Sequence, residues 1–150
     1  SVNISKKFPH TLVIKLIKRG PLARLVSGGQ KVVLTADGDV INVNEPANLP
    51  VIMIDIGQVP INGAINDIRI KRSLEFLEQT QKASLQINLV SDFDRLSLSA
   101  KMEKVDILFP QSGEMSTVVT TLQNLIAGFR IKGTMPTRID LRFDKPIIIF

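Results

Sequence analysis

The sequence has no cysteine, no tryptophan and no tyrosine, and its only aromatic residues are seven phenylalanines among 150 positions. Without cysteine the chain can form no disulfide bond, no thiol nucleophile and no cysteine-ligated zinc or iron–sulfur site. Proteins that bind single-stranded nucleic acid stack bases on aromatic side chains. Phenylalanines at core-like positions, such as Phe76, Phe109 and Phe129, make a poor platform for such stacking.

Histidine is nearly absent as well, because His10 is the only one. A metal site built from several histidines is therefore excluded, and a Ser/His/Asp triad would need a residue that lies in a turn. We interpret His10 as a solvated turn residue. These absences predict a protein that is not an enzyme and that holds no metal or cofactor.

Two pairs of closely spaced acids, Asp37 with Asp39 and Asp92 with Asp94, are the remaining candidates for acid–base chemistry or calcium binding. Neither pair has the Asp-x-Asp-x-Asp-Gly spacing, with glutamate at the twelfth position, that a calcium loop requires. Aspartate is common in turns because its side chain bonds nearby backbone N–H groups. We therefore interpret both pairs as turn residues.

Long apolar runs are also missing. No stretch approaches the roughly 18 to 20 apolar residues needed to cross a bilayer, and no basic start followed by an apolar segment marks a signal peptide. The sequence begins Ser-Val-Asn-Ile without an initiator methionine. We expect a fragment of a longer chain whose upstream anchor or signal is not included.

Isoleucine, leucine and valine dominate a hydrophobic content of 44%, which is enough for a folded core. The net charge of +5 is uneven, since the first 36 residues hold no acid. Such a basic end could face an acidic partner or anionic lipid headgroups, or it could be a solvated strand face. Its basic residues are Lys6, Lys7, Lys15, Lys18, Arg19, Arg24 and Lys31.

Two β-like runs, 2–7 and 11–19, open the chain, with Pro9 marking a turn between them. One face of the second run is wholly apolar, and two strands alone cannot bury it, so a missing part or a partner should cover it. Gly20-Pro21 then interrupts the strand pattern. We place a domain boundary there, between residues 1–19 and residues 20–150.

The pattern after residue 20 predicts an α+β domain with a mixed, mainly antiparallel sheet and two helices on one face. Gly28-Gly29 and Asp37-Gly38 predict tight hairpins. Apolar spacings of three and four predict a helix from Ile61 to Lys82. Ser116 or Thr117 is expected to cap a second helix that Gly133 ends. Its expected buried residues are Val118, Leu122, Leu125, Ile126 and Phe129. The expected strands are 22–26, 31–35, 40–43, 51–56, 85–90, 95–100, 105–109, 138–143 and 147–150.

The sequence ends with Pro146 and the apolar run 147–150. A run without alternation is typical of a strand covered on both faces, yet a terminal strand often lies at a sheet edge. An exposed apolar edge invites pairing with another chain unless charge interrupts it, and here Asp144 and Lys145 precede the run. Two interpretations stay open: β-augmentation by a partner strand, and an interior strand.

Five segments, in order, resemble the signature of the FtsQ/DivIB family of bacterial cell-division proteins. Family members show a Pro-x-x-Leu-x-Ile strand, a Pro-x-Ala step, an Asp-Gly hairpin, Leu-Pro before the next strand, and an apolar-Asp-Leu-Arg-aromatic strand near the end. The residues between Gly57 and Glu114 match no family motif. The matching segments are Phe8–Leu16, Pro21–Arg24, Thr35–Ile41, Asn48–Ile52 and Ile139–Phe143.

The resemblance implies that residues 1–19 are the last strands of a POTRA domain and residues 20–150 the family's β domain. Members are held in the cytoplasmic membrane by one upstream transmembrane helix, with these domains outside the cytoplasm at the division septum. They bind the coiled-coil proteins FtsB and FtsL and help control septal peptidoglycan synthesis by the divisome.

In that family the partner binds at the last strand of the β domain, and the resemblance implies neither a cofactor nor a nucleic-acid partner. The residues that inherit the partner-binding role are Arg142, Phe143, Lys145, Pro146, Ile147, Ile148, Ile149 and Phe150. Two other functions stay open. A POTRA-linked chaperone or secretion module would bind extended polypeptides broadly. A sequence pI near 9.7 also keeps nucleic-acid binding open.

Overall fold

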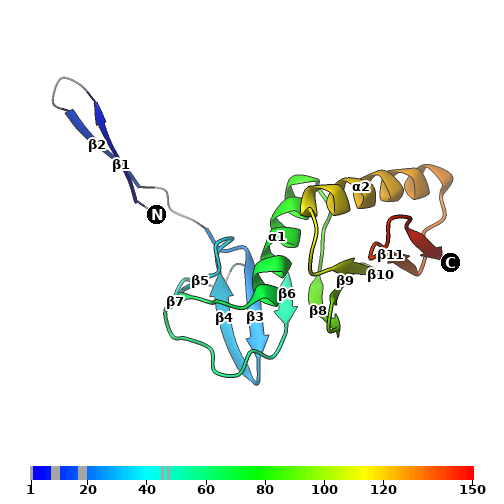
Figure 1. Ribbon diagram of the computed structural model, residues 1–150, viewed down its shortest axis with the longest axis horizontal. Coiled ribbons are helices and arrows are strands. Elements are labelled where there is room, and N and C mark those ends of the chain that lie inside the picture. The colour runs from blue at the N-terminus through cyan, green and yellow to red at the C-terminus, as the bar shows by residue number, and fades with distance from the viewer. Residues whose placement is uncertain (1, 8–10, 17–19, 45, 47) are drawn as a thin grey trace.

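The computed structural model describes residues 2–7, 11–16, 20–44, 46 and 48–150 (Figure 1). The described residues form a two-stranded sheet, a ten-stranded sheet and two helices. In the small sheet β1 (Val2–Lys7) pairs antiparallel with β2 (Thr11–Leu16). Both strands were expected, and the last three residues of the expected second strand lie outside the described part.

A three-stranded meander opens the larger sheet. Both predicted hairpins are confirmed, because Gly28 and Gly29 have φ angles of 52° and 83° and Gly38 has 86°. Glycine suits these turns, since a side chain at positive φ crowds the backbone. The strands are β3 (Ala23–Ser27), β4 (Gln30–Leu34) and β5 (Asp39–Ile41).

Three further elements follow: β6 (Val51–Met53), β7 (Gly63–Ala64) and α1 (Ile68–Lys82). The predicted start of this helix at Ile61 is wrong. Gly63 has a φ of 87° and belongs to a strand. Asp67 caps α1 by accepting a hydrogen bond of 2.8 Å from the Arg69 backbone N–H. The apolar spacing before Asp67 therefore matched a helix by coincidence, and Ile61 is 93% exposed.

A second meander consists of β8 (Leu89–Asp94), β9 (Ser97–Met102) and β10 (Val105–Pro110). β8 begins at Leu89 instead of Leu85 and includes residues 91–94, which the sequence pattern placed in a loop. The register shifts between Asp92 and Asp94. Such a bulge adds a residue to one strand and breaks the alternation from which strands are recognised.

Helix α2 (Met115–Lys132) lies on the same side of the larger sheet as α1 (Figure 1). Gly133 ends it as predicted, with a φ of 75°. The predicted cap at Ser116 or Thr117 is wrong, because Glu114 is the N-cap residue. Of the expected buried residues, Leu122 and Ile126 are buried, and Val118, Leu125 and Phe129 are half-buried against the core. Met115 and Val119, which were not expected, are buried as well.

The chain closes with β11 (Arg138–Asp140) and β12 (Ile147–Ile149), both shorter than predicted. The strand order is β12-β11-β10-β9-β8-β6-β3-β4-β5-β7. The β10–β11, β3–β6 and β6–β8 pairs are parallel and the other neighbours are antiparallel. The expected α+β class, with a mixed and mainly antiparallel sheet, is confirmed.

The core lies between the sheet and the two helices. Phe76 of α1 and Phe109 of β10 are fully buried and stack with ring centroids 4.1 Å apart. Arg72 of α1 is buried beside them, and its guanidinium donates to the carbonyl oxygens of Pro110 at 3.2 Å and Ser112 at 2.7 Å. These bonds satisfy a buried cation and fix the loop that leads into α2.

Candidate partner-binding edge

Strand β12 forms one edge of the larger sheet, since β11 is its only neighbour among the described strands. It lies beside the C-terminus, at the opposite end of the sheet from β5 and β7 (Figure 1). The sequence left open whether this strand is interior or at an edge. The strand order decides for the edge.

The backbone groups of Ile148 face away from β11. The strands pair antiparallel with Ile148 opposite Ile139. The N–H and the hydroxyl of Thr137 both donate to the Ile149 carbonyl, at 2.8 Å and 3.1 Å, so this carbonyl faces β11. Inward and outward groups alternate along an antiparallel strand. The N–H and C=O of Ile148 therefore lie at the centre of the open edge.

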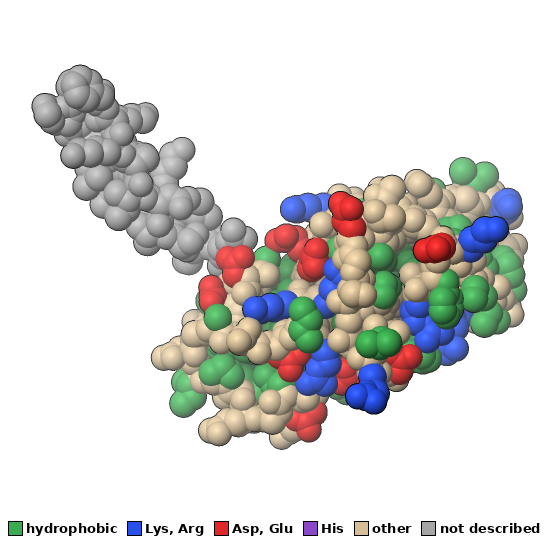
Figure 2. Space-filling view, in the orientation of Figure 1, with side chains coloured by type: hydrophobic (Ala, Val, Ile, Leu, Met, Phe, Trp, Pro, Cys, Tyr) green, Lys and Arg blue, Asp and Glu red, His purple; other side chains and the backbone are tan. Residues whose placement is uncertain are grey.

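Both faces of β12 carry apolar side chains. Ile148 packs against the core, whereas Ile147 and Ile149 point to the opposite face and are each 47% exposed. The ring of Phe150 is 67% exposed and meets Phe129 of α2 edge-on, with centroids 5.7 Å apart. Figure 2 shows hydrophobic and Lys or Arg side chains sharing the surface at this end of the molecule.

A groove separates α2 from the loop that joins β11 to β12. Its volume is about 320 Å³, and its lining includes Val118 and Thr121 of α2 and Phe143 and Pro146 of the loop. Farther along α2, Phe129 continues the half-buried face towards Phe150. A strand added to β12 would find apolar surface on the helix side that its own side chains could cover.

Arg142 does not present an unpaired charge to this edge. Its guanidinium donates to both carboxylate oxygens of Asp140, at 2.9 Å and 2.7 Å, and to Asp94 at 3.3 Å. The hydrogen bonds from Arg142 lower the pKa of Asp140. The same guanidinium lies 5.1 Å from the ring centre of Phe93 and 5.2 Å from that of Phe143. Arg142 thus holds Phe143 and the start of the loop against β8.

Phe93 is the residue of this surface that the sequence did not indicate. It sits in the bulge of β8 and is 42% exposed beside Arg142. An aromatic residue between two aspartates is a faint signal for an exposed ring. Nothing in the local pattern could have placed it next to a residue 49 positions later in the chain.

Asp92 and Asp94, one of the two aspartate pairs in the sequence, do not share a common site. Asp92 accepts a hydrogen bond of 2.9 Å from Arg69, whereas Asp94 accepts from the backbone N–H of Leu96 and from Arg142. The Leu96 N–H is the main cause of the lowered pKa of Asp94. The two carboxylates therefore have different partners. Within the described residues, no three His, Cys, Asp or Glu side chains gather in a group that could hold a metal ion.

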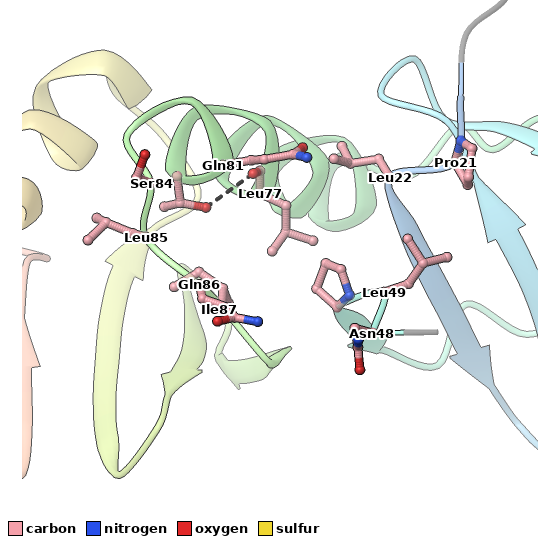
Figure 3. A pocket seen from close by; sticks show the side chains of 12 residues that line it. Pro21, Leu22, Asn48, Leu49, Leu77, Gln81, Ser84, Leu85, Gln86 and Ile87 are labelled. Carbon is pink, nitrogen blue, oxygen red and sulfur yellow. Dashed lines mark hydrogen bonds between the residues drawn. The ribbon is translucent and has the colours of Figure 1, made fainter. Parts of the chain in front are cut away.

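A second cavity lies far along the sheet from β12, between the end of α1, the start of β3 and the loop before β6. It encloses about 350 Å³. Leu77 points into it from α1, opposite Leu22 and Leu49 (Figure 3). None of the described residues that line it is charged, so these residues supply no side chain for acid–base chemistry. Its residues contributed nothing to the sequence-based site.

Several residues singled out from the sequence lie outside the described part of the chain. They are His10, Lys18, Arg19 and the side chains of Lys6, Lys7 and Lys15. Of the basic N-terminal group, the structure describes the half-buried Arg24 and the exposed Lys31. In the ranges that the structure covers, neither helix is long and apolar enough to span a bilayer.

Neither models of known protein families nor curated proteins match this sequence.

Proposed function

We propose that this chain is a non-enzymatic scaffold of bacterial cell division that binds partner proteins by β-strand addition at β12. The observation that carries this proposal is the coincidence, on one edge strand, of outward backbone groups at Ile148 with exposed Ile147 and Ile149. Main-chain bonds would give affinity and the apolar faces would give specificity.

The cell-division assignment rests on the resemblance to the FtsQ/DivIB family. Its motif residues Ile139–Phe143 cover the last two residues of β11 and the start of the loop that leads to β12. The partners are then coiled-coil proteins like FtsB and FtsL, and the setting is the outer side of the cytoplasmic membrane at the septum. Residues 1–19 would belong to a POTRA domain anchored through an upstream transmembrane helix.

The eight residues assigned from the sequence divide into two roles. Pro146, Ile147, Ile148, Ile149 and Phe150 form or adjoin the edge that a partner strand would meet. Arg142, Phe143 and Lys145 lie in the preceding segment, where Arg142 acts by positioning Phe143 through its bonds to Asp140.

The decisive variant is Ile148→Pro. Proline removes the outward N–H of β12 and leaves the bonds between β12 and β11 intact. We expect affinity for FtsB-like or FtsL-like partners from the same host to fall at least about tenfold, because the partner carbonyl loses its donor and stays unsatisfied. Binding is measured by calorimetric titration, and circular dichroism checks that the variant folds.

Two controls sharpen this experiment. Ile148→Val keeps the N–H and an apolar branched side chain, so affinity should stay nearly unchanged. Ala64→Pro places the same substitution on β7, at the other sheet edge, where the Ile65 N–H bonds to Gly38 at 2.9 Å and the Ala64 N–H therefore faces outward. Affinity unchanged in Ile148→Pro, or lost equally in Ala64→Pro, would refute β-addition at β12.

Other outcomes separate the remaining functions. Similar weak binding of many unrelated unfolded polypeptides would indicate a chaperone or secretion module. Binding of nucleic acid whose log affinity falls with log salt at roughly −0.9 per neutralised phosphate would indicate a nucleic-acid protein.

A further inference from the structure

The residues of β12 are arranged symmetrically about Ile148, and the binding of a different partner strand would not need this symmetry. The side chains on either side of Ile148 are identical, because Ile147 and Ile149 flank it. Both flanking residues are equally exposed, at 47%, and both lie on the face opposite the core. An antiparallel strand pair has a two-fold axis whenever one residue pairs with its own copy. Ile148 is placed at such a position.

We infer that two copies of this chain associate through their β12 strands, paired antiparallel about a two-fold axis at Ile148, and that this dimer competes with a partner strand for the same edge. The dimer rests on the geometry of β12 alone. The competition rests also on the proposed function.

The backbone bonds of this pairing follow from the outward groups of each strand. Each Ile148 N–H would donate to the Ile148 carbonyl of the second copy. Phe150 is two residues farther along, so its outward N–H would donate to the carbonyl of the second copy's Pro146. Pro146 has no N–H to return, which leaves four bonds in the pair and limits the ladder to this short segment.

The side chains are complementary in the same register. On the face opposite the helices, Ile147 of each copy would lie beside Ile149 of the other, which gives two cross-strand pairs of branched side chains. On the helix side, the exposed ring of Phe150 would cover the second copy's Pro146. Apolar surface exposed in one chain is thereby covered by the other.

The opposite sheet edge does not offer an equivalent site. β7 has only the two residues Gly63 and Ala64, and neither carries a large apolar side chain. Pairing of β12 with β7 of another copy would build an open-ended array, whereas pairing of β12 with β12 closes on itself. The geometry therefore points to a closed dimer. The small interface makes it weak, with a dissociation constant of about 0.1 to 1 mM.

Sedimentation velocity of the 150-residue chain between micromolar and millimolar concentrations tests this dimer. The weight-average mass should rise towards twice the monomer value for the unaltered chain and for Ala64→Pro, and stay monomeric for Ile148→Pro. Ile149→Lys should also stay monomeric, because it opposes a charge to Ile147 of the second copy. In parallel, exchange of the Ile148 amide hydrogen should slow at high concentration, by about twofold when half of the chains are dimeric, because only the bonded fraction is protected.

The possible outcomes distinguish this dimer from the partner site. A monomeric mass at every concentration, or unchanged Ile148 exchange on association, overturns the dimer and leaves partner binding standing. Association of Ile148→Pro as strong as that of the unaltered chain overturns it as well. A dimer without any FtsB-like or FtsL-like partner supports self-pairing and contradicts the proposed function. If both exist, raising the chain concentration above the dimer dissociation constant should weaken apparent partner affinity about twofold or more by mass action.

Discussion

The two edges of the larger sheet are built on opposite principles. β12 presents three isoleucines, is followed by the exposed Phe150 and is preceded by a loop that holds the exposed Phe143. β7 is a strand of only two residues, glycine and alanine. Both have outward backbone groups, but only β12 combines them with apolar side chains that a second strand can cover. A sheet edge becomes a binding site when its free backbone groups and its apolar side chains can both contact the same partner strand.

The edges also differ in what holds them. β12 is tied to β11, and the preceding loop is fixed by the contact of Arg142 with Asp140, Asp94 and two rings. The β7 edge is held mainly by backbone geometry, through the Ile65 N–H and the carbonyl of Gly38. The loop before β12 is therefore held by charged side chains, whereas β7 is held through Gly38, whose φ angle is positive.

The largest effect is expected from a change in the hydrophobic core, on which both edges of the sheet depend. Phe76→Ala deletes one partner of the buried stack with Phe109 and should lower the free energy of unfolding by about 3–5 kcal/mol. Urea unfolding followed by amide exchange at Ile65 and Thr137, whose N–H groups donate to Gly38 and Ile149 at the two edges, should show both edges unfolding together, because a single cluster of buried side chains supports both. Separate transitions at the two edges would show that the two ends of the sheet unfold as independent units.

A smaller effect should be confined to the β7 end. Gly38→Ala places a side chain at a φ of 86°, with its Cβ 3.5 Å from the Ile65 carbonyl, and should cost about 1–2 kcal/mol. Amide exchange at Ile65 should quicken while exchange at Thr137, whose N–H bonds to Ile149, is unchanged. Gly128→Ala is the matched control, because its Cβ would meet no atom within 4 Å and a helix interior favours alanine by up to about 1 kcal/mol. Loss of stability in that control would contradict the reasoning.

The smallest effect should be a pH dependence at the β12 end. The hydrogen bonds from Arg142 hold the pKa of Asp140 below its unfolded value of 3.8. Asp140 therefore contributes stability above pH 3.8 and loses it as the pH falls through the lower folded pKa. Asp140→Asn should reduce the drop in melting temperature between pH 5 and pH 2.5. An unchanged drop would show that Asp140 does not contribute to acid sensitivity.

The hairpin turns and the end of α2 could be predicted from the sequence because each depends on the backbone preference of one or two residues. Gly28-Gly29, Gly38 and Gly133 stand where positive φ angles end a strand or a helix. Errors arose where a distant contact overrode a local pattern. The half-buried position of Val118 follows from the groove beside the β11–β12 loop, which sequence spacing on one helix does not report.

The candidate site was predicted in part for the same reason. The apolar run 147–150 and the resemblance identified the segment, but the side chains around it come from elsewhere. Phe93 belongs to a bulge, and Arg142 is neutralised by Asp140 and Asp94 instead of facing a partner with an open charge. Bulges and ion pairs between strands depend on register, and register is set by the assembled sheet.

The sequence by itself determined the α+β class, the hairpin turns, the end of α2 and the presence of a hydrophobic last strand, because backbone preference and side-chain pattern act over a few residues. Only the tertiary structure decided that β12 is an edge, that Ile148 directs its N–H and C=O outward and that Phe129 lies beneath Phe150. β11 joins the sheet parallel to β10 after the whole of α2, and the competition among strands for neighbours at such distances is settled by burial of the common core.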